Sequence, residues 1–148
     1  MPKGIIKKMI GWARKQSPWV YHFPAGGGCN GCEIETLAAS GPRFDPQRLG
    51  ARFVTNPREA DVLLINGPVT IKNRQNLIRV YNQIPDPKVV VAVGACAVSG
   101  EIFRYSYSID CPVDKHIPVD LYVQGCPPRP HAILAAIKQA ASILEARI

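Results

Sequence analysis

Four of the five cysteines in this sequence lie in similar short segments that are rich in glycine. Two of them form a C-x-x-C pair directly after three glycines, and two are single and follow Gly94-Ala95 and Gly125; the four are Cys29, Cys32, Cys96 and Cys126. Each segment comes just after an apolar run that predicts a β-strand. If these strands are parallel, three separate loops bring four thiolates to one edge of one sheet. An iron–sulfur cluster can be held in this way.

The spacing of these cysteines favours a cluster over zinc. Thiolates are soft, charged ligands that suit both. A four-cysteine zinc site usually pairs two short cysteine knuckles, whereas this sequence has one knuckle, and Cys96 and Cys126 are single and far apart. A zinc-stabilised interaction module without redox work is therefore the alternative from another functional class.

The fifth cysteine, Cys111, lies outside the pattern, and we expect it to pack as a small buried hydrophobic residue. An odd number of cysteines also argues against a disulfide framework. A thioredoxin-like redox pair needs only Cys29 and Cys32 and would leave Cys96 and Cys126 unexplained. The four-cysteine site is therefore the preferred interpretation.

The same segment also matches a dinucleotide-binding fingerprint. Gly26, Gly28 and Gly31 fit G-x-G-x-x-G between a predicted strand and a predicted helix. However, Cys29 occupies the turn, and no acidic residue is clearly placed at a strand end about 20 residues later, as such a site requires. We therefore do not expect nucleotide binding.

Glu33 is a further candidate site residue, because it directly follows the C-x-x-C pair. One interpretation is that it lies near the cluster, where it relays protons or contacts a partner. The simpler one, which also applies to Glu35, is that carboxylates are favourable in the first turn of a helix. No Ser–His–Asp or paired-carboxylate arrangement stands out, so we assign no catalytic residue. The three histidines lack metal-site spacing and are expected to be structural: His22, His116 and His131.

Strands and helices alternate along the sequence. We expect strands at 19–23, 60–66, 88–94 and 119–123, a further strand or part of one at 52–55, and helices at 32–39, 73–84 and 130–146. A helical turn is expected at 97–103, whereas 104–117 has no clear period and is expected to cross the surface. The alternation predicts a single α/β domain: a flavodoxin-like, open, mainly parallel sheet with helices on both faces. In such sheets ligands bind beyond the carboxyl ends of the strands, where all three cysteine segments lie.

Length and composition fit one globular domain with a sizeable core. The chain has 148 residues, of which 47% are hydrophobic and 20% charged. No apolar run approaches the roughly 18 residues of a membrane-spanning helix, and the start lacks the pattern of a signal peptide. We therefore expect the chain inside the cell, where cysteines seldom form disulfides and more often bind metals or react.

Residues 1–16 are expected to form an amphipathic helical extension of an iron–sulfur-binding domain at 17–148. One helical face carries the apolar residues, and the other carries most of the basic residues behind the net charge of +7. This apolar face either lies on a membrane arm or anionic lipid, or packs on its own domain or a sister subunit. Nucleic-acid binding is disfavoured, because the basic residues are not interleaved with aromatic ones along a groove. The apolar residues are Ile5, Ile6, Met9, Ile10 and Ala13.

The chain resembles the small electron-transfer subunits shared by NiFe hydrogenases and respiratory complex I, where the equivalent is the 20-kDa, B-type subunit. The likeness runs from about residue 17 to residue 140, nearly the whole chain. The segments that carry it are GGGCNGCEIE (26–35), RFDPQRLGARFV (43–54), ADVLLINGPVT (60–70), PDPKVVVAVGACAVSG (85–100) and DKHIPVDLYVQGCPPRP (114–130).

The resemblance implies one 4Fe-4S cluster, which is the proximal cluster in hydrogenases and the last before quinone in complex I. It also implies three kinds of partner: a large NiFe catalytic subunit that reduces protons to hydrogen, a ferredoxin-like iron–sulfur subunit, and membrane-arm subunits. The chain is then a non-catalytic electron-transfer subunit of an oxidoreductase complex, held peripherally on the cytoplasmic side of the cell membrane. By position, the cluster ligands are Cys29, Cys32, Cys96 and Cys126.

Two departures narrow the resemblance. Complex I subunits carry two adjacent cysteines at the first site, whereas this chain has Cys29-Asn30-Gly31-Cys32, as in the hydrogenase branch. Uptake hydrogenase small subunits usually carry a further cluster-binding domain and an export signal, and we expect neither here. The remaining match is to the short subunit of energy-converting, membrane-bound hydrogenases, a group that includes formate hydrogenlyase. An equivalent subunit of a complex I-like quinone or sulfur-compound reductase is the alternative.

Overall fold

The structure, a computed structural model, describes residues 3–148 and contains one five-stranded sheet. All neighbouring strands are parallel, in the order β2-β1-β3-β4-β5. The strands are β1 (Trp19–Pro24), β2 (Arg52–Val54), β3 (Val62–Asn66), β4 (Val89–Val93) and β5 (Leu121–Val123). This strand order confirms the predicted flavodoxin-like α/β fold, and the sheet is wholly rather than mainly parallel.

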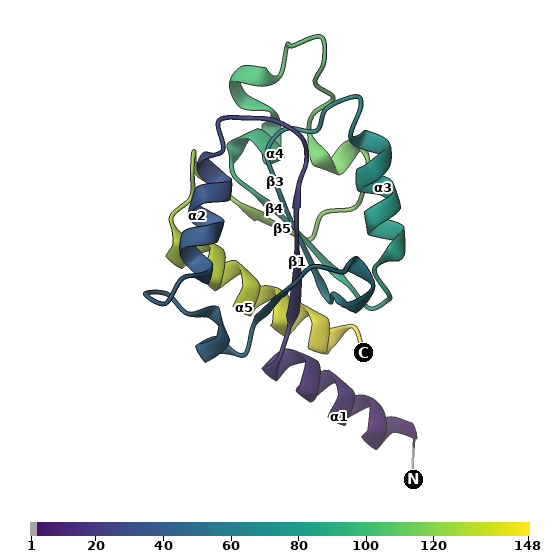
Figure 1. The fold of residues 1–148 in the computed structure, drawn as a ribbon. Coiled ribbons are helices and arrows are strands. Elements are labelled where there is room, and N and C mark those ends of the chain that lie inside the picture. Colours follow the sequence, from purple (N-terminus) through teal and green to yellow (C-terminus); the bar gives the residue numbers. More distant parts are fainter. Residues whose placement is uncertain (1–2) are drawn as a thin grey trace.

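Helices cover both faces of this sheet (Figure 1). α2 and α5 pack on one face, and α3 and α4 pack on the other, so that each face has its own apolar core. The helices are α1 (Lys3–Gln16), α2 (Gly31–Ser40), α3 (Arg74–Gln83), α4 (Ala95–Ser99) and α5 (Pro130–Ala146).

The central strands β3 and β4 are buried on both faces, and every residue in them is buried. This position explains their near-continuous apolar sequences, VLLIN and VVVAV. Side chains alternate between the two cores: Leu64 faces α2 and α5, whereas Leu63 and Ile65 face α3 and α4. The same alternation puts Asn66, the polar end of β3, on the α2/α5 side.

The chain reverses its direction across the sheet between β1 and β3. β2 pairs with one side of β1, and β3 pairs with the other. The carboxyl ends of β1 and β3 therefore form the topological switch point, where such sheets bind ligands. The loops after β1, β3, β4 and β5 all leave this edge of the sheet, at the top of Figure 1.

Several element boundaries differ from the sequence prediction by one or two residues. α4 begins at Ala95 rather than at 97, so Cys96 lies in the first turn of a short helix and not in a loop. β5 begins at Leu121 rather than at 119. The Asp120 side chain accounts for the later start, because its carboxylate accepts the N–H of Val90 at 2.8 Å in place of a backbone carbonyl.

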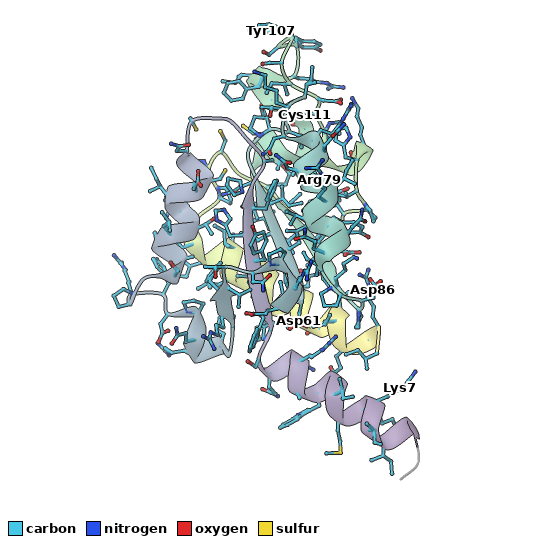
Figure 2. All side chains as sticks on the ribbon, turned by 45° about the vertical axis from the view of Figure 1, so that its right-hand side comes forward. Lys7, Asp61, Arg79, Asp86, Tyr107 and Cys111 are labelled. Atoms are coloured by element: carbon cyan, nitrogen blue, oxygen red, sulfur yellow. The ribbon has the colours of Figure 1, made fainter. Side chains whose placement is uncertain are left out.

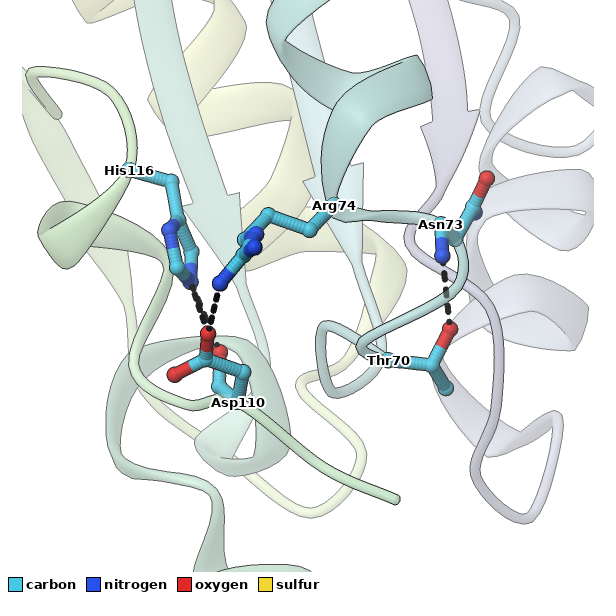
Figure 3. Close-up of polar contacts among 5 residues, drawn as sticks. All are labelled: Thr70, Asn73, Arg74, Asp110 and His116. Carbon is cyan, nitrogen blue, oxygen red and sulfur yellow. Dashed lines mark hydrogen bonds and ion pairs between the residues drawn. The ribbon is translucent and has the colours of Figure 1, made fainter.

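The segment 104–117 crosses the surface as predicted, yet it is tied to the domain by polar contacts (Figure 3). Arg74 Nη1 donates to Asp110 Oδ2 at 3.0 Å, and His116 Nε2 donates to the Asp110 carbonyl oxygen at 2.9 Å. His116 is therefore structural, as expected. These contacts fix the position of the next residue, Cys111, which is buried (Figure 2).

α1 lies at the opposite end of the domain from the cysteine segments, as the positions of Lys7 and Tyr107 in Figure 2 make clear. Gly11 of α1 packs against Glu145 of α5, and Lys15 Nζ lies 2.8 Å from the carboxylate of the same glutamate. The apolar face is not buried by these contacts, so it is available to something outside the chain. The exposed side chains are those of Ile5, Ile6, Met9, Ile10 and Trp12.

Within residues 3–148, no helix has both the length and the apolar character needed to cross a lipid bilayer.

The core assignment predicts that Leu64→Ala destabilises the fold strongly. Leu64 is fully buried between β3 and the α2/α5 helices, and loss of such a side chain costs about 2–5 kcal/mol. Ile102→Ala is a matched control, because Ile102 is 84% exposed, and its substitution should change stability by less than about 0.5 kcal/mol. Urea unfolding at equal iron content measures both. Small effects of equal size would contradict this core.

Candidate metal centre

Cys29 and Cys32 lie where the loop after β1 enters α2. Ala25 N donates to the Asn66 carbonyl oxygen at 2.8 Å, which continues the strand pairing one residue beyond β1. The chain then turns at Asn30, whose φ of 61° is a left-handed conformation that asparagine tolerates. This turn leaves Cys29 just before α2 and Cys32 in its first turn.

The segments that carry Cys96 and Cys126 are bonded to each other. Ala95 N donates to the Gly125 carbonyl oxygen at 2.9 Å. Gly94, just before α4, has a φ of 87°, which glycine adopts without the steric cost that other residues meet. The start of α4 is therefore fixed against the loop after β5, and the two single cysteines leave from adjacent points of the sheet edge.

The C-x-x-C segment packs directly on these two loops. A Cβ atom at Gly94 would overlap Cys32 Sγ. A Cβ atom at Gly31 would lie 3.4 Å from Cys29 Sγ and also 3.4 Å from Cγ of Pro127, the residue after Cys126. The absence of side chains at both glycines leaves the room that the sulfur atoms occupy. The fold thus brings the four cysteines singled out in the sequence to one place.

The thiols affect one another electrostatically. Burial, followed by the neighbouring Cys96, Cys126 and Cys29, raises the pKa of Cys32 to about 11. Burial, followed by Cys126 and Cys29, likewise raises the pKa of Cys96. Like charges close together in a partly dry site disfavour the thiolate form. Without metal, these two thiols keep their protons at neutral pH, and a cationic centre that binds there must displace them.

A cavity lies between the loop after β1 and the ends of β3 and β4. It is lined by Gly28, Cys29, Cys32, Glu33, Asn66 and Cys96, among others, and Cys126 is exposed. Within the described part of the chain, no three potential ligands are grouped closely enough to hold a single metal ion. An iron–sulfur cluster differs from a single ion in that each cysteine binds its own iron atom.

Three features of the site fit an iron–sulfur cluster. The donor set is four thiols, which are the usual cluster ligands. The glycines around them let backbone N–H groups approach sulfur, and such contacts tune a cluster. Asn66 Nδ2 is also a buried donor that meets no acceptor among residues 3–148, whereas cluster sulfur accepts hydrogen bonds.

Glu33 and Cys111 lie on different sides of this site. Glu33 is in the first turn of α2 and lines the cavity, so a proton-relay role for it stays a prediction. Cys111 is buried behind α4, where its Sγ donates to the Cys96 carbonyl oxygen at 3.6 Å, and burial raises the pKa of its thiol. It therefore packs against the segment that carries Cys96, in line with the expectation of a buried, structural thiol.

The sequence reasoning missed one residue at the site, Asn66, and the contact that orients it. Asn66 ends β3 and lines the cavity, and its Oδ1 lies 2.6 Å from His22 Nε2 on β1. A signal was present in the sequence, because the apolar run ADVLLIN ends in a polar residue at the carboxyl edge of a predicted strand. The partner was not visible, since it comes from another strand.

Comparison with known proteins identifies the family. The profile described as "NADH ubiquinone oxidoreductase, 20 Kd subunit" matches residues 29–140, which include all four site cysteines. The chain belongs to this family. Its members are subunits of oxidoreductase complexes, among them hydrogenases and NADH-quinone oxidoreductases. The resemblance inferred from the sequence is thereby confirmed.

Individual relatives point to membrane-bound complexes. The chain is 50% identical over 122 residues to the probable membrane-bound hydrogenase subunit mbhJ of Pyrococcus furiosus, with 82% of this chain and 72% of the relative covered. It is 43% identical over its full length to formate hydrogenlyase subunit 7 of Escherichia coli, of which it spans 56%. A solved chain of the archaeal membrane-bound sulfane sulfur reductase superposes with a TM-score of 0.81 at 38% identity and covers 94% of this chain and 76% of its own length.

The close packing at Gly94 predicts that Gly94→Ala displaces Cys32 and strains the backbone, since the new Cβ overlaps the sulfur at a φ that favours glycine. After anaerobic reconstitution with iron and sulfide, this variant should retain severalfold less iron than the wild-type chain. Gly27→Ala is the matched control, because a Cβ there meets only Thr70 Cγ2 at 3.7 Å and Pro68 Cγ at 3.8 Å. Equal iron content in the two variants would show that the space at Gly94 is not needed.

Proposed function

We propose that this chain holds one 4Fe-4S cluster and relays electrons through it within a membrane-bound oxidoreductase complex. The observation that carries the proposal is the meeting of four cysteines from three separate segments at the switch-point edge of a parallel sheet. When bound, the cluster supplies a one-electron carrier. Its ligands are Cys29, Cys32, Cys96 and Cys126.

The chain's own residues hold and insulate this carrier. Cys96 is buried at the start of α4, and the bond between Ala95 N and the Gly125 carbonyl oxygen keeps its segment against that of Cys126. β4, which ends beneath the site, consists only of buried apolar residues, and these keep water from that side of the site. Burial and hydrogen bonding are the means by which a protein sets a cluster's potential. A proton-relay role for Glu33, which lines the cavity, is part of this proposal.

Exposed apolar side chains around this edge support contact with a partner subunit. Tyr105 and Tyr107 are 93% and 95% exposed at the tip of the segment above the site (Figure 2). Ile102 lies just before this segment, and Ile34 and Leu37 are exposed on α2. Apolar surface of this kind marks interaction sites. A catalytic large subunit seated here shields the cluster and brings its own redox centre within electron-transfer distance.

Among complexes of this kind, a membrane-bound, energy-converting hydrogenase is favoured. Two relatives that cover most or all of this chain carry hydrogenase or formate hydrogenlyase names. The spacing of Cys29 and Cys32, which are not adjacent as in complex I subunits, also follows the hydrogenase pattern. In this proposal electrons arrive from a ferredoxin-like iron–sulfur subunit and leave for a NiFe large subunit, which reduces protons to hydrogen. The similarity to a sulfane sulfur reductase chain keeps a sulfur-compound or quinone reductase as the second candidate.

The exposed apolar face of α1 suggests a second contact surface, at the end of the domain opposite the cysteines. Its exposed apolar side chains, and Lys7 and Lys8 on the other side of the helix, lie remote from the site. We place this surface toward the membrane arm or lipid headgroups, with the chain held peripherally on the cytoplasmic side of the membrane.

The ligand assignment predicts the outcome of single cysteine substitutions. Cys96→Ser and Cys126→Ser each remove one cluster ligand, so the purified chain should lose most of its iron and its reduced-cluster electron paramagnetic resonance signal. Cys111→Ser is the matched control, because Cys111 is buried yet lies behind the site, and its iron content should stay near the wild-type value.

Two results would overturn this assignment. Equal iron loss from Cys111→Ser would mean that the ligand set is wrong. One zinc per wild-type chain after anaerobic purification, with no iron, would establish the zinc-stabilised interaction module instead.

The choice between hydrogenase and other reductases predicts the metal content of the intact complex. A complex isolated through a tag on this chain should contain one nickel per copy of the chain and evolve hydrogen from a reduced donor. Absence of nickel, with reduction of a quinone or a polysulfide, would assign the chain to the second candidate.

A further inference from the structure

Asn66 is a buried polar residue in whose side-chain amide only the oxygen has a hydrogen-bond partner among the described residues. The residue is 3% exposed at the end of β3. Oδ1 lies 2.6 Å from His22 Nε2, whereas Nδ2 finds no acceptor among the described residues 3–148. An amide N–H taken out of water without an acceptor is unfavourable, and native structures seldom keep one without a reason.

The free Nδ2 belongs to a residue that lines the cysteine cavity. Asn66 borders it together with Cys29, Cys32 and Cys96. The alternation of side chains along β3 puts that of Asn66 on the side of the sheet that α2 covers. Cys32 belongs to α2, and its Sγ lies against Gly94 at the end of β4. The cavity that Asn66 lines therefore also holds the sulfur atoms of three cysteines, and sulfur can accept a hydrogen bond.

The rest of Asn66 is held rigidly. Its carbonyl oxygen accepts from Ala25 N at 2.8 Å, and its backbone pairs with Pro24 on one side and with Val93 on the other. When the His22 ring carries its proton on Nε2, it donates to Oδ1, and Nδ2 is then the amide atom left without an acceptor. The opposite orientation would set a carbonyl oxygen against electron-rich sulfur.

We propose that Asn66 donates a hydrogen bond from Nδ2 to a sulfur of the bound cluster, and that His22 positions it for this purpose. This inference rests on the proposed function, because it needs the cluster. A donor to sulfur stabilises the reduced, more negative state and raises the reduction potential. Asn66 is thus a positioning and tuning residue, and it is not a ligand.

The test uses the full-length chain with its cluster reconstituted anaerobically, and it compares wild type, Asn66→Leu and Asn76→Leu. Leucine removes the donor at similar volume, and Asn76 is an exposed asparagine on α3, on the other face of the sheet. Iron content and the reduced-cluster resonance signal come first, followed by a redox titration of that signal.

We expect all three proteins to bind four irons. At the wild-type midpoint potential, Asn66→Leu should show about a tenfold lower ratio of reduced to oxidised cluster, equivalent to a midpoint about 59 mV more negative for a one-electron couple. Asn76→Leu should match the wild type. A fully loaded Asn66→Leu protein with an unchanged midpoint overturns the inference and leaves the proposed function intact. A wild-type chain that binds no iron overturns both.

If Asn66→Leu fails to take up iron, the wild-type protein decides the matter. Labelling the side-chain amide of asparagine with ¹⁵N should give a weak nitrogen coupling to the reduced cluster in pulsed paramagnetic resonance. Asn30, which also lines the cavity, is removed as a source by Asn30→Asp, and the coupling should persist in that variant. No coupling in the wild type, or its loss in Asn30→Asp, rejects the role of Asn66.

Discussion

The structure depends on one constraint, the crowding of sulfur atoms at a single edge of the sheet. Burial, followed by the neighbouring thiols, raises the pKa of Cys32 and Cys96, and in the absence of metal these thiols resist ionisation. When the same sulfur atoms surround a cationic core, the ionised thiolate form is favoured instead, because each negative sulfur is then paired with iron. The surroundings of the site are those that a tightly packed group of large sulfur atoms requires, with glycine at Gly31 and Gly94 and a direct backbone bond between the loops after β4 and β5.

The two-sided sheet provides the rigidity that this crowding demands. β3 and β4 are buried from end to end, so the edge on which Asn66 and Gly94 sit has little freedom to shift. The surface segment 104–117 adds support from the side, since Asp110 is held by Arg74 and His116 and places Cys111 behind the Cys96 segment. The buried thiol of Cys111 therefore supports the segment that carries Cys96 from behind.

The sequence predicts most of this fold, because its local signals are strong. The apolar runs at β3 and β4 and the glycines before Cys29, Cys96 and Cys126 suffice to predict parallel strands that end in cysteine loops. What it does not predict depends on contacts between distant segments. The Asp120 carboxylate shortens β5 through a bond to Val90, and the Asn66–His22 contact joins two strands that only the sheet topology brings together. No local sequence pattern predicts these two contacts.

The two exposed apolar surfaces lie at opposite ends of the domain, and this separation bears on how such a subunit is built into a complex. Electron transfer needs close contact only at the end of the domain that carries the four cysteines, where Tyr105 and Tyr107 are exposed. The exposed face of α1 is remote from that edge, so its contacts contribute nothing to the relay itself. Gly11 and Lys15 anchor the helix to α5, and its apolar side chains point elsewhere. One end of the domain is thus suited to passing electrons and the other to attachment, with the rigid sheet fixing the distance between them.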